Sequence, residues 1–292
     1  MTVWNDRFSP LVRAALDRFE WKTIDALRQR LILQNIAAVK RQFVREGTAA
    51  VKAALASKTT ASIETAVNKA IDGQRKNWAR TIGDEIYQRS GGILAERTFR
   101  SLNAKSVILD IDTKQTAVED PPTIEEARPQ WVASIDAYLK EEMAEKIKEI
   151  ADTSKKKIGK IISKGLEDGD SVQTMARNIR AKYKSFSVSR AITIARTETI
   201  QASNLGSQSG AEATGLPLLK QWLSTLDSRT RRRPRDKFDH RAVNGQRRKL
   251  DKTYKVSGQA LKFPGDTSKG ASAGNTINCR CTEIYLPDKS AA

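Results

Sequence analysis

At 292 residues the chain has room for one large domain or two ordinary ones, but only 39% of its residues are hydrophobic and 6% aromatic, which favours an elongated helical body over one large core. Its 52 lysines and arginines exceed its 34 acidic residues by 18, so we expect a polyanionic partner, first nucleic acid and second an acidic protein surface or anionic lipid. No apolar run approaches the roughly 18 residues of a membrane span. The first residues lack a cationic and apolar leader, so we expect synthesis in a cytosol, and two cysteines give no basis for a disulfide framework.

Residues 1–112 are predicted to form a helical N-terminal arm. Apolar side chains recur at spacings of three and four between residues 24 and 43, which places them on one face of a helix. The polar run 57–60 predicts a break, and a further helix is predicted from residue 63 to the Gly91–Gly92 pair, a typical helix end. These patterns indicate packing helices without an enzyme motif.

Two short elements complete the predicted arm. A helix is expected at 93–102, followed by a strand at 105–112, where β-branched residues partly alternate with polar ones. Residues 113–122 end in Asp-Pro-Pro and are predicted to be a linker.

Residues 123–217 are predicted to form a helical middle region. Thr123 and Glu126 have capping-box spacing, and the helix that follows carries apolar residues on one face down to about Ile162 and glutamates on the other. A break rich in glycine and aspartate then precedes two shorter helices, which we expect to be separated at 185–187.

Residues 218–292 change character and are strongly basic. Between residues 222 and 292 there are 16 basic and 7 acidic side chains, a net charge of +9. Strand-like composition at 221–226, 260–263 and 277–286 alternates with polar loops, which predicts a small basic α+β module, near the size at which a polar or metal staple supports a marginal core. The predicted fold class is therefore a mainly α N-terminal body with a small α+β C-terminal module.

The only histidine and both cysteines of the chain fall in this module. His240, Cys279 and Cys281, with Asp227, are four ligands that suit Zn²⁺, although cysteines two residues apart on a strand lie about 7 Å apart and chelate only if the chain turns. Three interpretations stay open: a structural zinc site, a hydrogen-bonded polar staple with buried thiols, and a hydrolytic centre in which His240 is the general base. The chain has one histidine and no nucleophile elbow or phosphate loop, so we expect no enzyme, and no cofactor besides the zinc alternative.

Cations without interleaved aromatic residues surround His240. Such cations neutralise phosphates rather than read bases, so we expect contact with the backbone of nucleic acid, with a merely solubilising surface as the alternative. The predicted nucleic-acid-binding residues are Arg229, Arg231, Arg232, Arg233, Arg235, Arg247, Arg248 and Lys249.

Four short motifs follow one another towards the C-terminus. They are Ala195-Arg196-Thr197-Glu198, then Trp222 leading into Asp227-Ser228-Arg229-Thr230-Arg231, then Asp239-His240 with Asn244-Gly245-Gln246, and last Phe263-Pro264-Gly265-Asp266 with Asn278-Cys279-Arg280-Cys281. In this order they resemble the Mu-F-type phage head morphogenesis proteins, the minor head proteins of tailed phages. The basic insert 232–237 departs from the tighter turn expected there. The structural motif residues are Trp222, Asp227, His240, Gly245, Pro264, Asn278, Cys279 and Cys281.

The resemblance implies a minor structural protein of a tailed-phage head. Such a protein would assist head assembly at the portal vertex and contact packaged double-stranded DNA without sequence preference. Its partners would be the portal protein and capsid or scaffold proteins, and its location the head interior, after assembly in the host cytoplasm. The alternative from the residues is a metal-dependent nuclease or toxin-like enzyme that uses His240 and Asp227.

Overall fold

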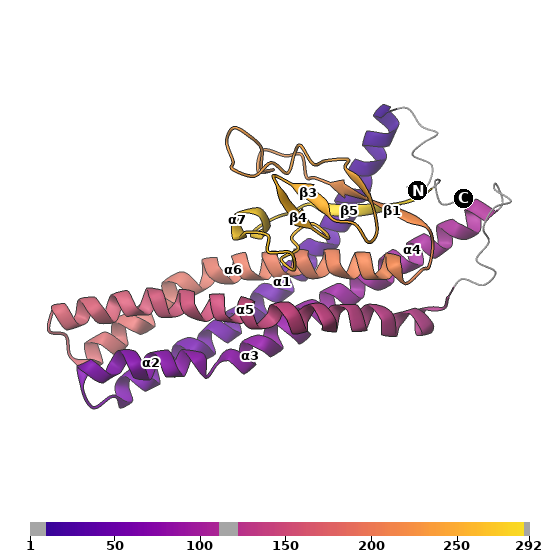
Figure 1. The fold of residues 1–292 in the computed structure, drawn as a ribbon. Coiled ribbons are helices and arrows are strands. Elements are labelled where there is room, and N and C mark those ends of the chain that lie inside the picture. The colour runs from indigo at the N-terminus through magenta and orange to yellow at the C-terminus, as the bar shows by residue number, and fades with distance from the viewer. Residues whose placement is uncertain (1–9, 111–121, 289–292) are drawn as a thin grey trace. The chain divides into compact units, whose positions relative to one another are not determined.

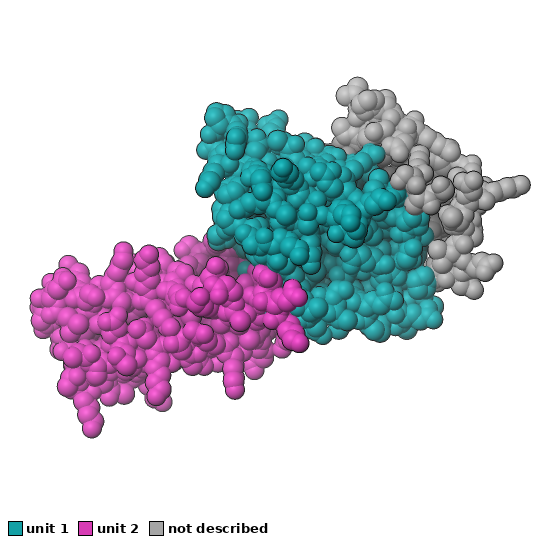
Figure 2. Space-filling model, in the orientation of Figure 1, with its two compact units in different colours: residues 1–32, 86–139, 197–292 teal, residues 33–85, 140–196 magenta. Residues whose placement is uncertain are grey.

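The computed structural model describes the backbone of residues 10–110 and 122–288, and the side chains of residues 20–104 and 122–288. The chain divides into two compact units, each assembled from segments distant in sequence. Unit 1 contains residues 1–32, 86–139 and 197–292, and unit 2 contains residues 33–85 and 140–196 (Figure 2). The predicted division into domains at residues 112, 123 and 217 stays a prediction.

Three long helices account for about half of the described chain. They are α1 (Pro10–Ala56), α5 (Ile124–Glu167) and α6 (Val172–Glu212) (Figure 1). None of the described helices combines the length and the apolarity that crossing a membrane requires. The predicted class, a mainly α body with a small α+β C-terminal module, is confirmed.

Unit 2 is built around a buried carboxylate on α1. The Glu46 carboxylate accepts hydrogen bonds from Trp78 Nε1 at 2.7 Å and from the Tyr183 hydroxyl at 3.0 Å, and burial raises its pKa. The Arg190 guanidinium lies 4.7 Å from the centre of the Phe43 ring, a cation–π contact that places its charge near this carboxylate. These contacts join α1 and α6 to α3 (Arg75–Arg80).

The predicted break after α1 is confirmed, but the predicted helix end at the glycine pair is wrong. Helix α1 ends at Ala56, and the 3-10 turn η2 (Thr60–Ser62) precedes α2 (Ile63–Asp72). After α3, a π-helical segment, η3 (Thr81–Gly91), continues into α4 (Gly92–Asp110) without a stop. The strand predicted at 105–112 is also wrong, because α4 extends through Asp110. Residues 111 and 112 and most of the predicted linker, 113–121, lie outside the described residues.

Gly91 is used for close approach between helices rather than for a stop, whereas a Cβ atom on Gly92 would have open space. A Cβ atom on Gly206 of α6 would lie 2.6 Å from the carbonyl carbon of Gly91, and one on Gly210 would lie 2.8 Å from that of Ala95. Small residues therefore let the backbones of α4 and α6 touch. This contact is not visible from the spacing of residues within either helix.

Two predictions from short sequence patterns concern the start of α5 and the continuity of α6. The Thr123 N–H donates to Glu126 Oε2 at 2.8 Å and the Glu126 N–H donates to Thr123 Oγ1 at 3.3 Å, so the capping box is confirmed. The break predicted at 185–187 is wrong, because α6 is one helix. Ser185 and Ser189 turn their hydroxyls back to carbonyls of the preceding turn, which keeps them compatible with the helix.

The C-terminal module contains two antiparallel sheets. Strands β1 (Leu218–Leu223), β2 (Arg247–Lys249) and β5 (Thr282–Pro287) form one sheet in the order β2-β1-β5 (Figure 1). Strands β3 (Tyr254–Val256) and β4 (Gln259–Leu261) pair separately, and α7 (Ala273–Thr276) is a single turn. The three predicted strands are displaced by a few residues, and β2 and β3 were not predicted at all. A three-residue strand of sequence Arg-Arg-Lys carries no apolar alternation that would indicate it.

The C-terminal half of α6 supports this module. Every residue from 197 to 211 is buried, including polar Asn204 and Gln208. A helix buried on all sides shows no amphipathic stripe, and the close contacts of Gly206 and Gly210 with backbone atoms require small residues there. Asn204 Nδ2 donates to the Pro264 carbonyl at 2.6 Å and to the Cys281 carbonyl at 3.1 Å, so the polar side chains of this helix fasten the module's loops.

Candidate functional site

The loop between β1 and β2 positions His240. The main-chain N–H of His240 donates to the Arg231 carbonyl at 3.0 Å, and its own carbonyl accepts from Ser224 Oγ at 2.6 Å. The imidazole packs edge-on against the Trp222 ring, with 5.7 Å between ring centres. His240 is only 1% exposed, so its ring is held in one orientation inside the module.

The two cysteines lie on the turn between α7 and β5. Asn278 has a φ of 55°, and its N–H donates to Thr197 Oγ1 of α6 at 3.0 Å. The Cys281 carbonyl is held by Asn204 and by the buried Arg28 guanidinium of α1, 3.5 Å away. The turn brings the thiols closer than the about 7 Å of an extended strand, so that their sulfur atoms lie within 4.8 Å of each other.

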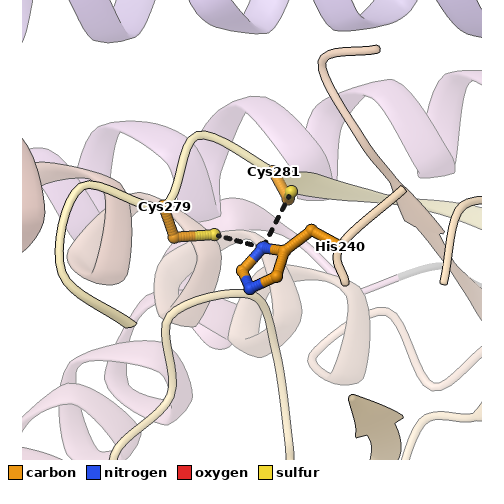
Figure 3. A group of neighbouring side chains, drawn as sticks. All are labelled: His240, Cys279 and Cys281. Atoms are coloured by element: carbon orange, nitrogen blue, oxygen red, sulfur yellow. Dashed lines mark hydrogen bonds between the residues drawn. The ribbon is translucent and has the colours of Figure 1, made fainter. Parts of the chain in front are cut away.

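Both thiols converge on one nitrogen of the imidazole. Cys279 Sγ lies 3.6 Å and Cys281 Sγ 3.5 Å from His240 Nδ1, as Figure 3 shows. The other ring nitrogen, Nε2, lies 2.7 Å from Asn275 Oδ1. We call His240, Cys279 and Cys281 the thiol–imidazole cluster. All three side chains are buried, and their possible metal-ligand atoms lie within 4.8 Å of one another.

The pKa values of the three cluster residues depend on one another. A hydrogen bond from Cys281 lowers the pKa of Cys279 well below its ordinary value, and the nearby imidazole adds to that effect. Burial raises the pKa of Cys281, so its proton stays between the two sulfurs. Burial alone would lower the pKa of His240, but the Cys279 thiolate and the hydrogen bonds to Cys279 and Asn275 raise it overall.

Asp227 is not part of the cluster. Its Oδ1 atom accepts hydrogen bonds from the Arg280 guanidinium at 2.6 Å and from the main-chain N–H groups of Arg229 and Thr230, each at 3.0 Å. The hydrogen bond from Arg280 holds the pKa of Asp227 well below its usual range. Asp227 therefore acts as the cap of the turn after β1, and Arg280, between the two cysteines, ties that turn to the cluster's chain segment.

The other motif residues build the frame of the cluster. Trp222 exchanges main-chain hydrogen bonds with the turn before β2, accepting from the Gly245 N–H at 2.8 Å. Gly245 has a φ of 82°, which favours glycine there. The Pro264 carbonyl accepts from Asn204, and the Phe263-Pro264-Gly265-Asp266 turn closes with the Asp266 N–H donating to the Phe263 carbonyl at 3.0 Å.

The predicted phosphate-binding residues divide into two groups. Arg231, Arg235 and Arg247 donate to protein oxygens: Arg231 to the Ile277 carbonyl, Arg235 to the Ser228 and Thr230 carbonyls, and Arg247 to Gln221 Oε1 at 2.8 Å. Arg248 likewise donates to the carbonyl of Arg247 at 2.8 Å. The side chains of Arg229, Arg232, Arg233 and Lys249 are exposed.

The exposed arginines are presented by a turn that their main chain stabilises. The N–H of Arg232 donates to Asp236 Oδ2 at 3.0 Å and the N–H of Arg233 to Asp239 Oδ2 at 3.2 Å. In the described part of the chain, neither guanidinium group makes a hydrogen bond. We call residues 229–235 the arginine loop; its backbone is fixed while the charges of Arg232 and Arg233 extend from it.

A second basic surface was missed from the sequence. A cavity of about 930 Å³ in unit 2 lies between α5 and α6 and is lined by Lys156, Lys160 and Lys164 of α5 and Lys182 of α6. The first three are four residues apart, a spacing that places them on one face of a helix. We call this cavity the lysine groove. The regular spacing was the signal that could have revealed it.

Residues 156–284 match the protein family described as Phage Mu protein F like protein. The resemblance to Mu-F-type head morphogenesis proteins is confirmed. The Mu F-like segment comprises a little under half of the chain, and it contains the thiol–imidazole cluster, the arginine loop and the four lysines of the lysine groove. The match supports a structural role in a phage head.

Part of the chain is also similar to an enzyme. Over 127 residues the chain is 32% identical to the NAD(+)–arginine ADP-ribosyltransferase EFV of Enterococcus faecalis, an alignment that covers 42% of this chain and 24% of that protein. The chain thus matches about a quarter of the length of this curated relative. No solved structure matches the chain.

Proposed function

We propose that this protein is a minor structural protein of a tailed-phage head, which assists head assembly at the portal vertex and contacts the packaged DNA without reading its sequence. The family match of residues 156–284 carries the proposal. The portal protein and the capsid or scaffold proteins are the expected protein partners. The expected location is the head interior, after assembly in the host cytoplasm.

The contact with DNA is assigned to the exposed cations. Arg232 and Arg233 on the arginine loop, with the lysine groove as a second surface, offer flexible positive charges without aromatic side chains between them. Such surfaces bind phosphates through charge and counterion release. Sequence-selective contact with base edges is therefore not expected.

The role of the cluster is structural rather than catalytic in this proposal. His240 is 1% exposed, its Nε2 atom is engaged by Asn275, and its Nδ1 atom faces two sulfurs, so no ring nitrogen is directed towards a substrate. Asp227, the partner of the nuclease alternative, is neutralised by Arg280. A general base needs hydrogen-bond reach to the proton that it removes.

The test is association with heads. The protein is co-expressed with the portal, scaffold and major capsid proteins of the same phage, and the assembled particles are purified by sedimentation and analysed by mass spectrometry. We expect the protein in the particles at a low and reproducible ratio to the portal protein. Its absence from particles that contain the portal would contradict the proposal.

A parallel assay addresses enzymatic alternatives. The protein is incubated with duplex DNA and Mg²⁺, Mn²⁺ or Zn²⁺, and separately with NAD⁺ and an arginine-rich acceptor protein, beside His240→Ala. We expect neither cleavage nor modification. Metal-dependent cleavage that the His240→Ala variant lacks would favour the nuclease, and labelling of the acceptor would favour a transferase.

A further inference from the structure

We propose that His240, Cys279 and Cys281 bind a zinc ion that fastens the C-terminal module. The ligands are His240 Nδ1 and the two sulfurs, all buried and within 4.8 Å of one another. Imidazole and thiolate are the ligand types that zinc prefers in structural sites. This assignment is independent of the proposed role in the phage head.

The separations in the cluster are those of ligands around one ion. With Zn–S bonds of about 2.3 Å, Zn–N bonds of about 2.05 Å and tetrahedral angles, sulfur and nitrogen on the same zinc ion are about 3.6 Å apart. The observed distances from Nδ1 are 3.6 Å to Cys279 Sγ and 3.5 Å to Cys281 Sγ. The two sulfur–nitrogen separations thus match those expected around one ion, and the two sulfur atoms lie within 4.8 Å of each other.

The hydrogen-bond network around the imidazole fixes the tautomer that coordination needs. The Ser272 main-chain N–H, which can only donate, lies 3.1 Å from Gln259 Oε1, so that atom is an acceptor. Asn275 faces the same atom at 3.0 Å and must direct its amide nitrogen there. Its carbonyl oxygen then faces His240 Nε2 at 2.7 Å, and Nε2 carries the ring proton of the neutral imidazole.

The consequence is a bare lone pair on Nδ1, aimed at the two sulfurs. A metal-binding histidine typically donates its other N–H to an oxygen that fixes the ring, and Asn275 fills that place. Without a metal, Nδ1 has one lone pair and accepts at most one S–H donor, so the second cysteine relies on a proton shared between the two sulfurs. A zinc ion, in contrast, takes one bond from each of the three atoms.

The position of the ligands in the chain gives the ion a structural purpose. His240 lies on the loop after β1, and the cysteines lie 39 and 41 residues later, next to the last strand. The module is small, and three of its strands, β2, β3 and β4, are only three residues long. Small domains with such limited cores are commonly stabilised by a metal that joins distant segments.

The carboxylate of Asp227 is excluded as the fourth ligand. Arg280 and two main-chain N–H groups already engage its Oδ1 atom. Three protein ligands leave one position on zinc for a small ligand such as water. The Ser224 hydroxyl lies next to the cluster, with its Oγ atom 3.8 Å from Cys281 Sγ.

The test uses the full-length protein. Protein purified without chelator is analysed for metals by mass spectrometry, then stripped with a chelator under reducing conditions and titrated with Zn²⁺ and, separately, with Co²⁺. We expect about one zinc per chain and a Co²⁺ spectrum with thiolate charge-transfer and tetrahedral d–d bands. We also expect a higher midpoint of thermal unfolding after zinc is returned.

Variants distinguish the site from adventitious binding. Cys279→Ser and His240→Asn should lose the Co²⁺ thiolate bands or the stoichiometric zinc, whereas Asp227→Asn should retain both. Asn275→Ala, a change behind the ligand, should weaken zinc binding about 10- to 100-fold in competition with a chromogenic chelator.

Two results would overturn the proposal. One is wild-type protein that stays folded by circular dichroism and binds no stoichiometric Zn²⁺ or Co²⁺. The other is Asp227→Asn losing the metal while Cys279→Ser keeps it. Both can be read from the wild-type titration and soluble variants, so a variant that fails to fold does not decide the question.

Discussion

The thiol–imidazole cluster and the arginine loop are neighbours in sequence but opposites in environment. His240 is 1% exposed and bonded on every side, whereas Arg232 and Arg233, a few residues earlier, are exposed with guanidinium groups that make no hydrogen bond in the described structure. The Arg231 carbonyl joins the two, because it accepts the N–H of His240. Clustering of chemically distinctive residues in a sequence thus reflects two separate tasks, holding the module and presenting charge.

The largest effect is expected from removing the imidazole. His240→Ala deletes a buried ring that contacts Trp222 and leaves Asn275 and two thiols without their partner. We expect a loss of roughly 4 kcal/mol, the size for truncating a large buried side chain in a polar network. Chemical denaturation followed by tryptophan fluorescence measures it, and a loss below about 1 kcal/mol would contradict the role assigned to the cluster.

The second largest effect is expected from disturbing the close contact between Gly206 of α6 and the backbone of Gly91. Gly206→Ala places a Cβ atom against the backbone of Gly91, and we expect a loss of about 3 kcal/mol from overpacking that no side chain can relieve. Gly92→Ala is the matched control. It is also helical, a Cβ there has open space within 4 Å, and it should be neutral or stabilising by up to about 1 kcal/mol. Equal losses in the two variants would show that the helix contact is not tight.

A third prediction concerns pH and the buried side of the module. Burial raises the pKa of Glu283 from an ordinary 4.5 to about 7. Between these values the folded protein keeps a proton that the unfolded chain has released, so stability falls as pH rises from about 4.5 to 7 and then levels off. The expected fall attributable to this group is roughly 3 kcal/mol.

Glu283→Gln isolates that contribution. The variant cannot ionise at this position, so its stability should vary less between pH 5 and pH 7 than that of the wild type, as measured by urea denaturation at each pH. The Tyr285 hydroxyl, 2.7 Å from Glu283 Oε1, retains an acceptor in the variant. Identical pH profiles would show that Glu283 is not the group responsible.

A smaller effect separates the arginines of the loop. Arg235 donates to the Ser228 and Thr230 carbonyls, so Arg235→Ala should destabilise the module by about 1 kcal/mol. Arg232→Ala and Arg233→Ala remove no side-chain hydrogen bond and should change stability by less than about 0.5 kcal/mol. Thermal unfolding of the three variants compares them, and a larger loss for Arg232→Ala than for Arg235→Ala would reverse the assignment.

The sequence predicts the features that depend on neighbours along the chain. The capping box of Thr123 and Glu126 and the break after α1 are local, and both are confirmed. The Gly91–Gly92 pair misleads because Gly91 lies against Gly206, more than one hundred residues later. The grouping of His240 with the two cysteines could be predicted because these residue types are rare in the chain. Asp227 does not join them because it pairs with Arg280, and no spacing rule in the sequence identifies that pair.

The burial of α6 also lies beyond sequence reasoning. Its segment 197–211 consists mostly of small and polar residues, which is typical of an exposed segment. It is nevertheless buried throughout, because α4 and the loops of the module approach it closely. The lysine groove, in contrast, was predictable from the spacing of Lys156, Lys160 and Lys164. Sequence periodicity identifies a helix that has one solvent-exposed face, but it gives no pattern for a helix that is buried on all sides.

The most direct test of the division between framework and charge is the salt dependence of DNA binding. The affinity for duplex DNA is measured across a series of salt concentrations for the wild type, for the double variant Arg232→Ala/Arg233→Ala and, to compare the second proposed DNA-binding surface, for Lys156→Ala/Lys160→Ala. We predict weaker binding by the arginine variant and a slope of log K against log salt that is smaller by about 2, with an unchanged fold. An unchanged slope in that variant, or a collapse of its fold, would contradict the account, because the exposed arginines would then not be the groups that neutralise phosphates.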